Sequence, residues 1–228
     1  MSRIGTVVRM QFVNRWTFIW IPLIILGGTF VITLLIHWMI PTDEPKFGGG
    51  AQAPMWYMLS AGIMAMAATF PFSQAMSITR REFYIGTMTA GAITSGIMAL
   101  VFIIGGLIED ATNGWSFNSY FFRLDWLWQA GAVVAGIFYF ALTMLLFSMG
   151  LFFATVYRRW GAPVLTIGLV SLGLVLVGVV FLITKFELWG GVAQFFMNAG
   201  VTGLTFMLLG LTVAFAAAAY LPLRRSTP

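Results

Sequence analysis

The feature that most constrains this chain is a series of six long stretches that contain no Asp, Glu, Lys or Arg. Each stretch exceeds the roughly 20 residues that an α-helix needs to cross a bilayer core about 30 Å thick. A helix also satisfies its own backbone hydrogen bonds, which lipid cannot do. The sequence therefore predicts an all-α integral membrane protein with six transmembrane helices. The uncharged stretches are 16–42, 47–79, 83–108, 126–157, 160–184 and 188–223.

The composition supports this fold class. Hydrophobic residues make up 60% of the 228 residues and charged residues 8%, whereas soluble domains average roughly 45–50% and roughly 25%. The net charge is +5, but the twelve basic residues are scattered singly and in pairs and do not form the basic patch typical of nucleic-acid binding. Because the chain has no cysteine, disulfide scaffolds, thiolate metal sites and cysteine nucleophiles are excluded.

We expect one transmembrane domain over residues 1–228. Outer segments 41–53 and 109–125 contain turn signals, and region 185–198 is either an apolar hairpin that re-enters the membrane or the start of the sixth helix. The expected parts are an interfacial helix at 1–15 and transmembrane helices at approximately 16–42, 54–76, 86–108, 126–157, 160–184 and 196–223.

The basic residues predict the orientation of these helices. Alternate connections hold nine of the twelve basic residues, whereas the other connections hold only Lys46, Arg123 and Lys185. Short loops rich in Lys and Arg stay in the cytoplasm, so both termini are expected to be cytoplasmic, in a bacterial plasma membrane. The nine are Arg3, Arg9, Arg15, Arg80, Arg81, Arg158, Arg159, Arg224 and Arg225.

Several kinds of chemistry have no matching motif in the sequence. There is no Gly-x-x-x-x-Gly-Lys-Ser/Thr loop to hold phosphates, so we expect this chain not to hydrolyse ATP itself. Proton-coupled pumps usually need a charged residue in the middle of a span. None of the six spans has one, so the sequence does not favour a proton-coupled pump. The serines within the spans lack the base and carboxylate of an intramembrane hydrolase. We expect no enzyme activity and no cofactor or metal in this chain.

The single histidine, His37, lies near the outer end of the first span. We interpret it as an interfacial residue. A cation site shared with Glu109 and Asp110 is the weaker alternative, because one histidine and two carboxylates at unrelated spacing are poor evidence for a metal.

Small residues recur at helix-packing spacing on two spans. Gly210, Ala214 and Ala218 lie four residues apart on the sixth span, and Gly150 and Ala154 repeat the pattern on the fourth. Such ladders let helix backbones approach closely. They predict either packing within the chain or a seam between two chains.

The stretch 77–86 has the sequence SITRREFYIG. Thr79 and Glu82 have the spacing of a capping box, which predicts a helix that begins at Arg80. Gly86 is a natural residue for its end, so we expect a short cytoplasmic helix. Pro71 is expected to kink the second span just before this stretch.

The residues before the first span predict an amphipathic helix. Ile4, Val7, Val8 and Phe12 share one helical face, and Arg3, Thr6 and Arg9 lie away from it, as in helices that lie on a membrane surface. Gln11 and Arg15 fall near the apolar face and fit this pattern poorly.

The layout resembles the transmembrane subunit of a type-2 ABC transporter, an exporter-like permease with six helices. The motif that carries the resemblance is an Arg-Glu-Phe followed by Gly-Thr, here Arg81, Glu82, Phe83, Gly86 and Thr87. The resemblance implies that 79–85 is a coupling helix, 2–15 a connecting helix, and 185–198 a re-entrant segment. The coupling residues that would dock on the ATPase subunit are Thr79, Arg80, Arg81, Glu82, Phe83 and Tyr84.

The resemblance further implies a separate ATPase subunit that holds ATP and Mg²⁺, and a second permease chain, identical or related. Phe83 would be the buried anchor of the ATPase contact. The expected function is ATP-driven export of a hydrophobic or amphipathic substrate. The alternatives are a substrate-capturing membrane subunit of a vitamin importer and a structural or assembly membrane protein.

Overall fold

The computed structural model describes residues 3–42 and 44–224, and most of them are helical. The predicted all-α class is confirmed. Five helical segments of the described residues are long and apolar enough to cross a membrane: Trp16–Met39, Gly49–Ala75, Arg80–Ala111, Ala132–Lys185 and Trp189–Leu223. Outside them lie α1 (Arg3–Val13), the short helix α6 (Asp125–Trp128), a turn η4 (Gly114–Asn118) and two strands, β1 (Lys46–Phe47) and β2 (Ser119–Tyr120). The strands pair in parallel.

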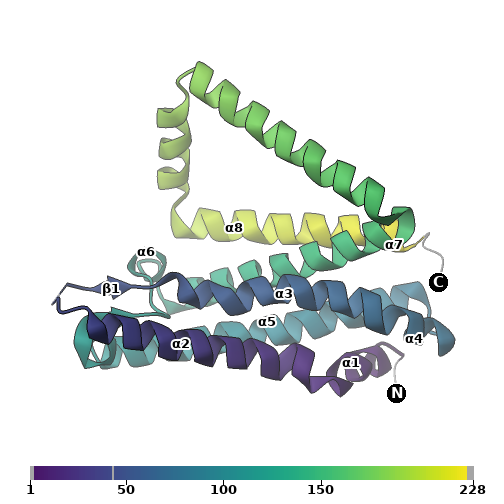
Figure 1. The fold of residues 1–228 in the computed structure, drawn as a ribbon, viewed down its shortest axis with the longest axis horizontal. Helices are drawn as coiled ribbons and strands as arrows, with labels where there is room; N and C mark the ends of the chain where they lie inside the picture. Colours follow the sequence, from purple (N-terminus) through teal and green to yellow (C-terminus); the bar gives the residue numbers. More distant parts are fainter. Residues whose placement is uncertain (1–2, 43, 225–228) are drawn as a thin grey trace.

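Five helical segments are found where the sequence predicts six, because α7 (Ala132–Lys185) joins two of the predicted spans. Its 54 residues are more than twice the roughly 20 that one crossing needs. The backbone leaves the helical conformation at Gly161, with φ 81° and ψ 179°, and α7 bends sharply there (Figure 1). The predicted start at residue 126 is wrong, because α6 is a separate short helix and Gly131, at φ 91°, separates it from α7.

The last helix, α8 (Trp189–Leu223), contains a second break at Gly200, with φ 57° and ψ −171°. Most of region 185–198 is helical and forms the first part of α8. The predicted start of the sixth transmembrane helix at residue 196 is therefore too late. Figure 1 shows that the second part of α7 and the first part of α8 stand away from the remaining helices.

Two five-residue π-helical turns interrupt the first two spans. The turn η1 (Trp16–Trp20) precedes α2 (Ile21–Met39), and η3 (Ala65–Thr69) lies between α3 (Ala53–Met64) and α4 (Phe70–Ala75). Each turn ends two residues before a proline, Pro22 or Pro71. Proline lacks an N–H and its ring collides with the carbonyl four residues earlier, and the wider π turn accommodates that collision. At Pro71, where the sequence predicts a kink, the structure has this π turn just before the proline.

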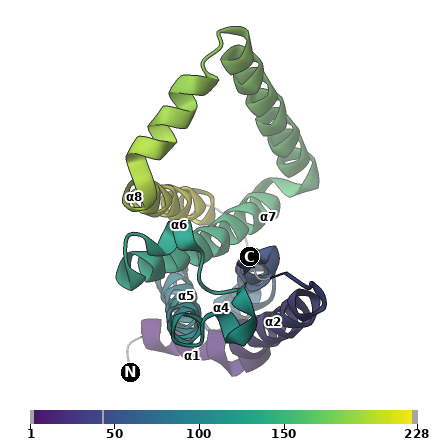
Figure 2. The same ribbon diagram turned by 90° about the vertical axis from the view of Figure 1, so that its left-hand side faces the viewer.

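The body of the molecule is a bundle of α2, α3, α5 (Arg80–Ala111), the first part of α7 and the last part of α8 (Figures 1 and 2). The crossing of α3 and α7 depends on glycine. A Cβ on Gly62 would collide with the Phe147 carbonyl, and one on Gly150 with the Leu59 carbonyl. The predicted close packing at Gly150 is confirmed, and Gly62 is its partner on α3.

The amphipathic helix α1 lies across the end of the bundle (Figure 2) and packs on α5. Val7 is fully buried there, and Gln11 is buried with hydrogen bonds to Thr87 (2.9 Å) and Thr69 (3.1 Å). Gln11 fits the surface-helix pattern poorly because it faces protein rather than lipid.

The described arginines predicted to be cytoplasmic lie at one end of the molecule, which holds α1, the start of α5, the bend of α7 and the end of α8 (Figure 1). We call it the arginine-rich end. The strands and α6 lie at the opposite end, the outer end. The predicted cytoplasmic Arg225 and residues 1–2 of the interfacial helix predicted at 1–15 lie outside the described residues.

Candidate functional site

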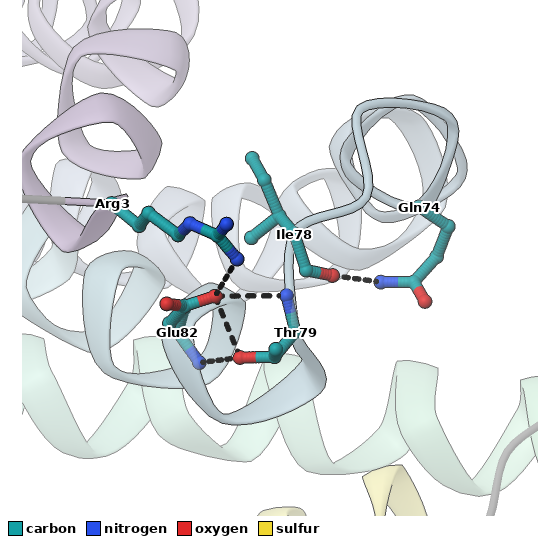
Figure 3. A network of polar contacts seen from close by, with 5 residues as sticks. All are labelled: Arg3, Gln74, Ile78, Thr79 and Glu82. Atoms are coloured by element: carbon teal, nitrogen blue, oxygen red, sulfur yellow. Dashed lines mark hydrogen bonds and ion pairs between the residues drawn. The ribbon is translucent and has the colours of Figure 1, made fainter.

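The capping box predicted at the start of α5 is confirmed. Thr79 has extended backbone angles, and its hydroxyl accepts a hydrogen bond from the Glu82 N–H at 3.3 Å. The Glu82 carboxylate accepts hydrogen bonds from the Thr79 N–H (2.9 Å) and the Thr79 hydroxyl (2.7 Å), as Figure 3 shows. Together these bonds satisfy N–H groups that a helix start leaves free.

The predicted short helix is wrong, because α5 continues from Arg80 to Ala111 without a break. Gly86 does not end it. A Cβ on Gly86 would lie 2.5 Å from the Val7 Cβ and 3.2 Å from the Ile4 carbonyl. Gly86 is therefore the position where α1 crosses α5, and the predicted coupling helix is the first part of the third span.

Phe83 is fully buried inside its own chain. Its ring centroid lies 5.1 Å from that of Phe70 in an edge-to-face contact, and it shares a core cluster with Val7 and Leu223. This burial leaves no part of Phe83 for the predicted anchor contact with a partner. Its side chain instead joins α5 to α1, α4 and α8.

Arg80 and Tyr84 connect the start of α5 to the end of α8. The Arg80 guanidinium donates to the Arg224 carbonyl at 2.7 Å, and the Tyr84 hydroxyl donates to the Ala216 carbonyl at 2.6 Å. The Tyr84 ring also packs on Tyr220, with centroids 5.0 Å apart. Both side chains are thus occupied within the chain.

The charged surface at this turn consists of Arg3, Glu82 and Arg81. The Arg3 guanidinium lies 4.0 Å from the Glu82 carboxylate, which ties α1 to the capping box (Figure 3). Arg81 is exposed and forms no ion pair with any described residue. Of the six predicted docking residues, Arg81 is the one whose charge is left for a partner.

Two apolar side chains beside this turn were missed by the sequence analysis. Phe72 is 57% exposed and Met76 is 51% exposed, both near the end of the second span. The turn that follows is fixed by Gln74, whose side chain donates to the Ile78 carbonyl at 3.2 Å (Figure 3). The four-residue spacing of Phe72 and Met76, which places them on one helical face, was the available signal.

The ladder on α8 does not pack within the chain. Gly210 has open space where a Cβ would lie, and Ala214 is exposed while Ala218 is half-buried. The contact between α8 and α7 includes Thr212, which donates to the Ala141 carbonyl at 3.3 Å. The small-residue face of α8 is therefore directed away from its own chain.

The outer end contains a buried carboxylate whose role the sequence analysis missed. Glu109 is fully buried. It accepts hydrogen bonds from the indole N–H of Trp115 (3.0 Å) and from the backbone N–H groups of Phe121 (2.9 Å), Phe122 (2.9 Å) and Arg123 (2.8 Å). This one side chain holds the outer loop against the end of α5.

His37 is 6% exposed and its Nδ1 lies 2.7 Å from the Ser119 hydroxyl. It is therefore a buried link between the first span and β2. Among residues 3–42 and 44–224, no group of three His, Cys, Asp or Glu side chains is arranged to hold a metal ion. Both carboxylate oxygens of Glu109 accept hydrogen bonds from the outer loop.

No family model, curated protein or solved structure matches this chain.

Proposed function

We propose that this chain is the permease subunit of an ATP-driven transporter of the type-2 ABC kind, energised by a separate ATPase subunit that carries ATP and Mg²⁺. The observation that carries the proposal is the attachment of the α5 start to three other elements. Glu82 reaches Arg3 of α1, Phe83 packs on Phe70 of α4, and Tyr84 binds α8.

Such attachment gives a force on this turn a direct route to the bundle. A partner shifts an equilibrium between two states only when it contacts them differently. The junction of α1, α4, α5 and α8 lies at the arginine-rich end. A partner bound there would contact the two states differently if the start of α5 moves between them, and the attached helices would move with it. The contact itself would use the charge of Arg81 and the exposed side chains of Phe72 and Met76.

The proposal includes six crossings, with both termini in the cytoplasm of a bacterial cell. Parts 132–160 and 162–185 of α7 each exceed the roughly 20 residues of a crossing, and Arg158 and Arg159 precede the bend between them. Lys and Arg favour the cytoplasmic side. The apolar bundle favours a hydrophobic or amphipathic substrate, moved outward.

We also propose that two chains pair through the outward face of α8. Gly210 and Ala214 allow close approach of a second backbone. Gly210 has open space where a Cβ would lie, and Ala214 is exposed. An Ala214→Cys variant should form an oxidative cross-link between chains in membranes, and Val213→Cys, on an adjacent face, should form less. Equal cross-linking of the two would count against the seam.

The coupling role is tested by Arg81→Glu in the full chain. When the chain is expressed together with its neighbouring genes, we expect co-purification of an ATPase subunit to fall at least about tenfold, since a charge pair at such a rim becomes a repulsion. The thermal unfolding of the chain should not change, because Arg81 forms no ion pair within the described residues.

Arg9→Glu is the matched control, since Arg9 is an exposed arginine of α1 at the same end. It should leave the association intact. Undiminished association of the Arg81→Glu chain would refute the coupling role.

A further inference from the structure

A cavity of about 730 Å³ lies where α3 and its π turn η3 face the bend of α7. Its volume falls within the roughly 300–1,000 Å³ of small-molecule sites. Met66 and Ala67 of η3 form one wall, and Phe153 and Leu165, on the two sides of Gly161, form another. Apart from Tyr157 and Arg158, the cavity is lined by apolar residues and glycine.

Arg158 supplies the only charge among the lining residues. Its guanidinium carbon lies 4.9 Å from the centre of the Phe70 ring, and it forms no ion pair with a described residue. Among the described residues, Glu82 is the acidic side chain at this end, and it is held by Thr79 and Arg3. A half-buried cation without a counter-ion favours an anionic ligand, because burial weakens its solvation.

The cavity has the polarity of an amphiphile. Arg158 and Tyr157 lie at the arginine-rich end of the bundle. In the orientation proposed above, this end lies at the level of the cytoplasmic lipid head groups, which tyrosine prefers. Phe153 lies farther into the apolar part of α7. Basic pockets between transmembrane helices on the cytoplasmic side bind anionic head groups. In this cavity, the apolar lining lies next to the charge of Arg158.

The wall on the α3 side is itself irregular. Met66 and Ala67 belong to the π turn before Pro71, and π turns occur frequently at functional sites. The opposite wall is broken by Gly161. The cavity therefore lies between two backbone irregularities rather than between two regular helices.

We propose that this cavity binds an anionic phospholipid, with its phosphate on Arg158 and an acyl chain along Phe153 and Leu165. The site goes beyond the transport function proposed above and does not require an ATPase partner, so it is testable on the isolated full-length chain.

The test is native mass spectrometry of the purified chain in mild detergent, titrated with phosphatidylglycerol or with phosphatidylcholine of the same acyl chains. We expect phosphatidylglycerol to bind more tightly. Arg158→Gln should weaken that binding about five- to tenfold, as expected for one arginine at a membrane surface. Arg9→Gln, at an exposed arginine of the same end, should leave it unchanged.

A second variant protects the test against misfolding of Arg158→Gln. Ala67→Phe keeps the charge and narrows the cavity at the wall that Ala67 forms, so it should also weaken phosphatidylglycerol binding. Equal binding of the two lipids, or unchanged binding by both variants, would overturn the proposal. A lipid-free dimer with the cavity covered would do the same, because a second copy would then be its occupant.

Discussion

Gly86 illustrates how one residue type serves different purposes in this chain. Glycine commonly follows the last turn of a helix, and that frequency made Gly86 look like the end of a short helix. Its actual role depends on α1, because a side chain at this position would overlap Val7.

Replacing Gly86 with alanine should therefore push α1 away from α5. We expect a loss of about 1–3 kcal/mol in the free energy of unfolding, as for other overpacked contacts, measured by thermal or denaturant unfolding in detergent. The matched control is Gly96→Ala on the same helix, where a Cβ meets nothing within 4 Å. It should be neutral or stabilising by up to about 1 kcal/mol. Equal effects of the two substitutions would contradict the assigned role of Gly86.

Glu109 gives a second prediction for a single residue. Glu109→Ala leaves four N–H donors of the outer loop without their acceptor, and each unsatisfied buried donor costs about 1–3 kcal/mol. We expect at least about 3 kcal/mol of destabilisation and faster proteolysis of the loop that holds Phe121 and Phe122. Asp110→Ala removes an exposed carboxylate paired with Arg123 and should cost about 1 kcal/mol or less. A Glu109→Ala chain as resistant to protease as the Asp110→Ala chain would show that the loop is held by other contacts.

At the scale of helices, three glycines in the second half of the chain set where helices stop. Gly131, Gly161 and Gly200 have φ of 91°, 81° and 57°, with ψ of 160°, 179° and −171°. This backbone region is essentially restricted to glycine. The charged residues that bound the apolar runs show where those runs begin and end. The sequence does not distinguish, among its 25 glycines, the three that bend the chain.

Gly161→Ala should strain the bend of α7. An alanine in this conformation costs on the order of 1–3 kcal/mol, so we expect a lower unfolding temperature and a lower yield of folded protein. Gly168→Ala, on the same helix in open space, is the control and should be neutral or slightly stabilising. Similar melting temperatures for both variants would mean that α7 bends without needing glycine at this position.

At the scale of the whole molecule, the number of crossings decides how the chain is arranged in the membrane. The chain has no cysteine, so a maleimide label on a single introduced cysteine reports the accessibility of that position alone. We expect Thr112→Cys and Glu187→Cys to react with a membrane-impermeant maleimide in intact cells. Ala162→Cys, at the bend of α7, should react only after permeabilisation. Reaction of all three from the same side would show that α7 does not cross twice.

The sequence by itself determined the features that depend on near neighbours. The apolar runs exceed the length of a membrane crossing, so they predict the helical class and most of the approximate spans. The capping box at Thr79 and Glu82 follows from contacts within a few residues, and the structure confirms it. The π turn before Pro71 also depends on contacts within a few residues.

Only the tertiary structure decided which of these residues are available to a partner. Phe83 is buried and Gly86 is a helix crossing because α1 and α8 fold back onto the start of α5. Glu109 becomes the anchor of the outer loop because backbone N–H groups more than ten residues away converge on it. Local patterns specify helices and their ends, but burial depends on which distant segments pack together, and no short stretch of sequence contains that information.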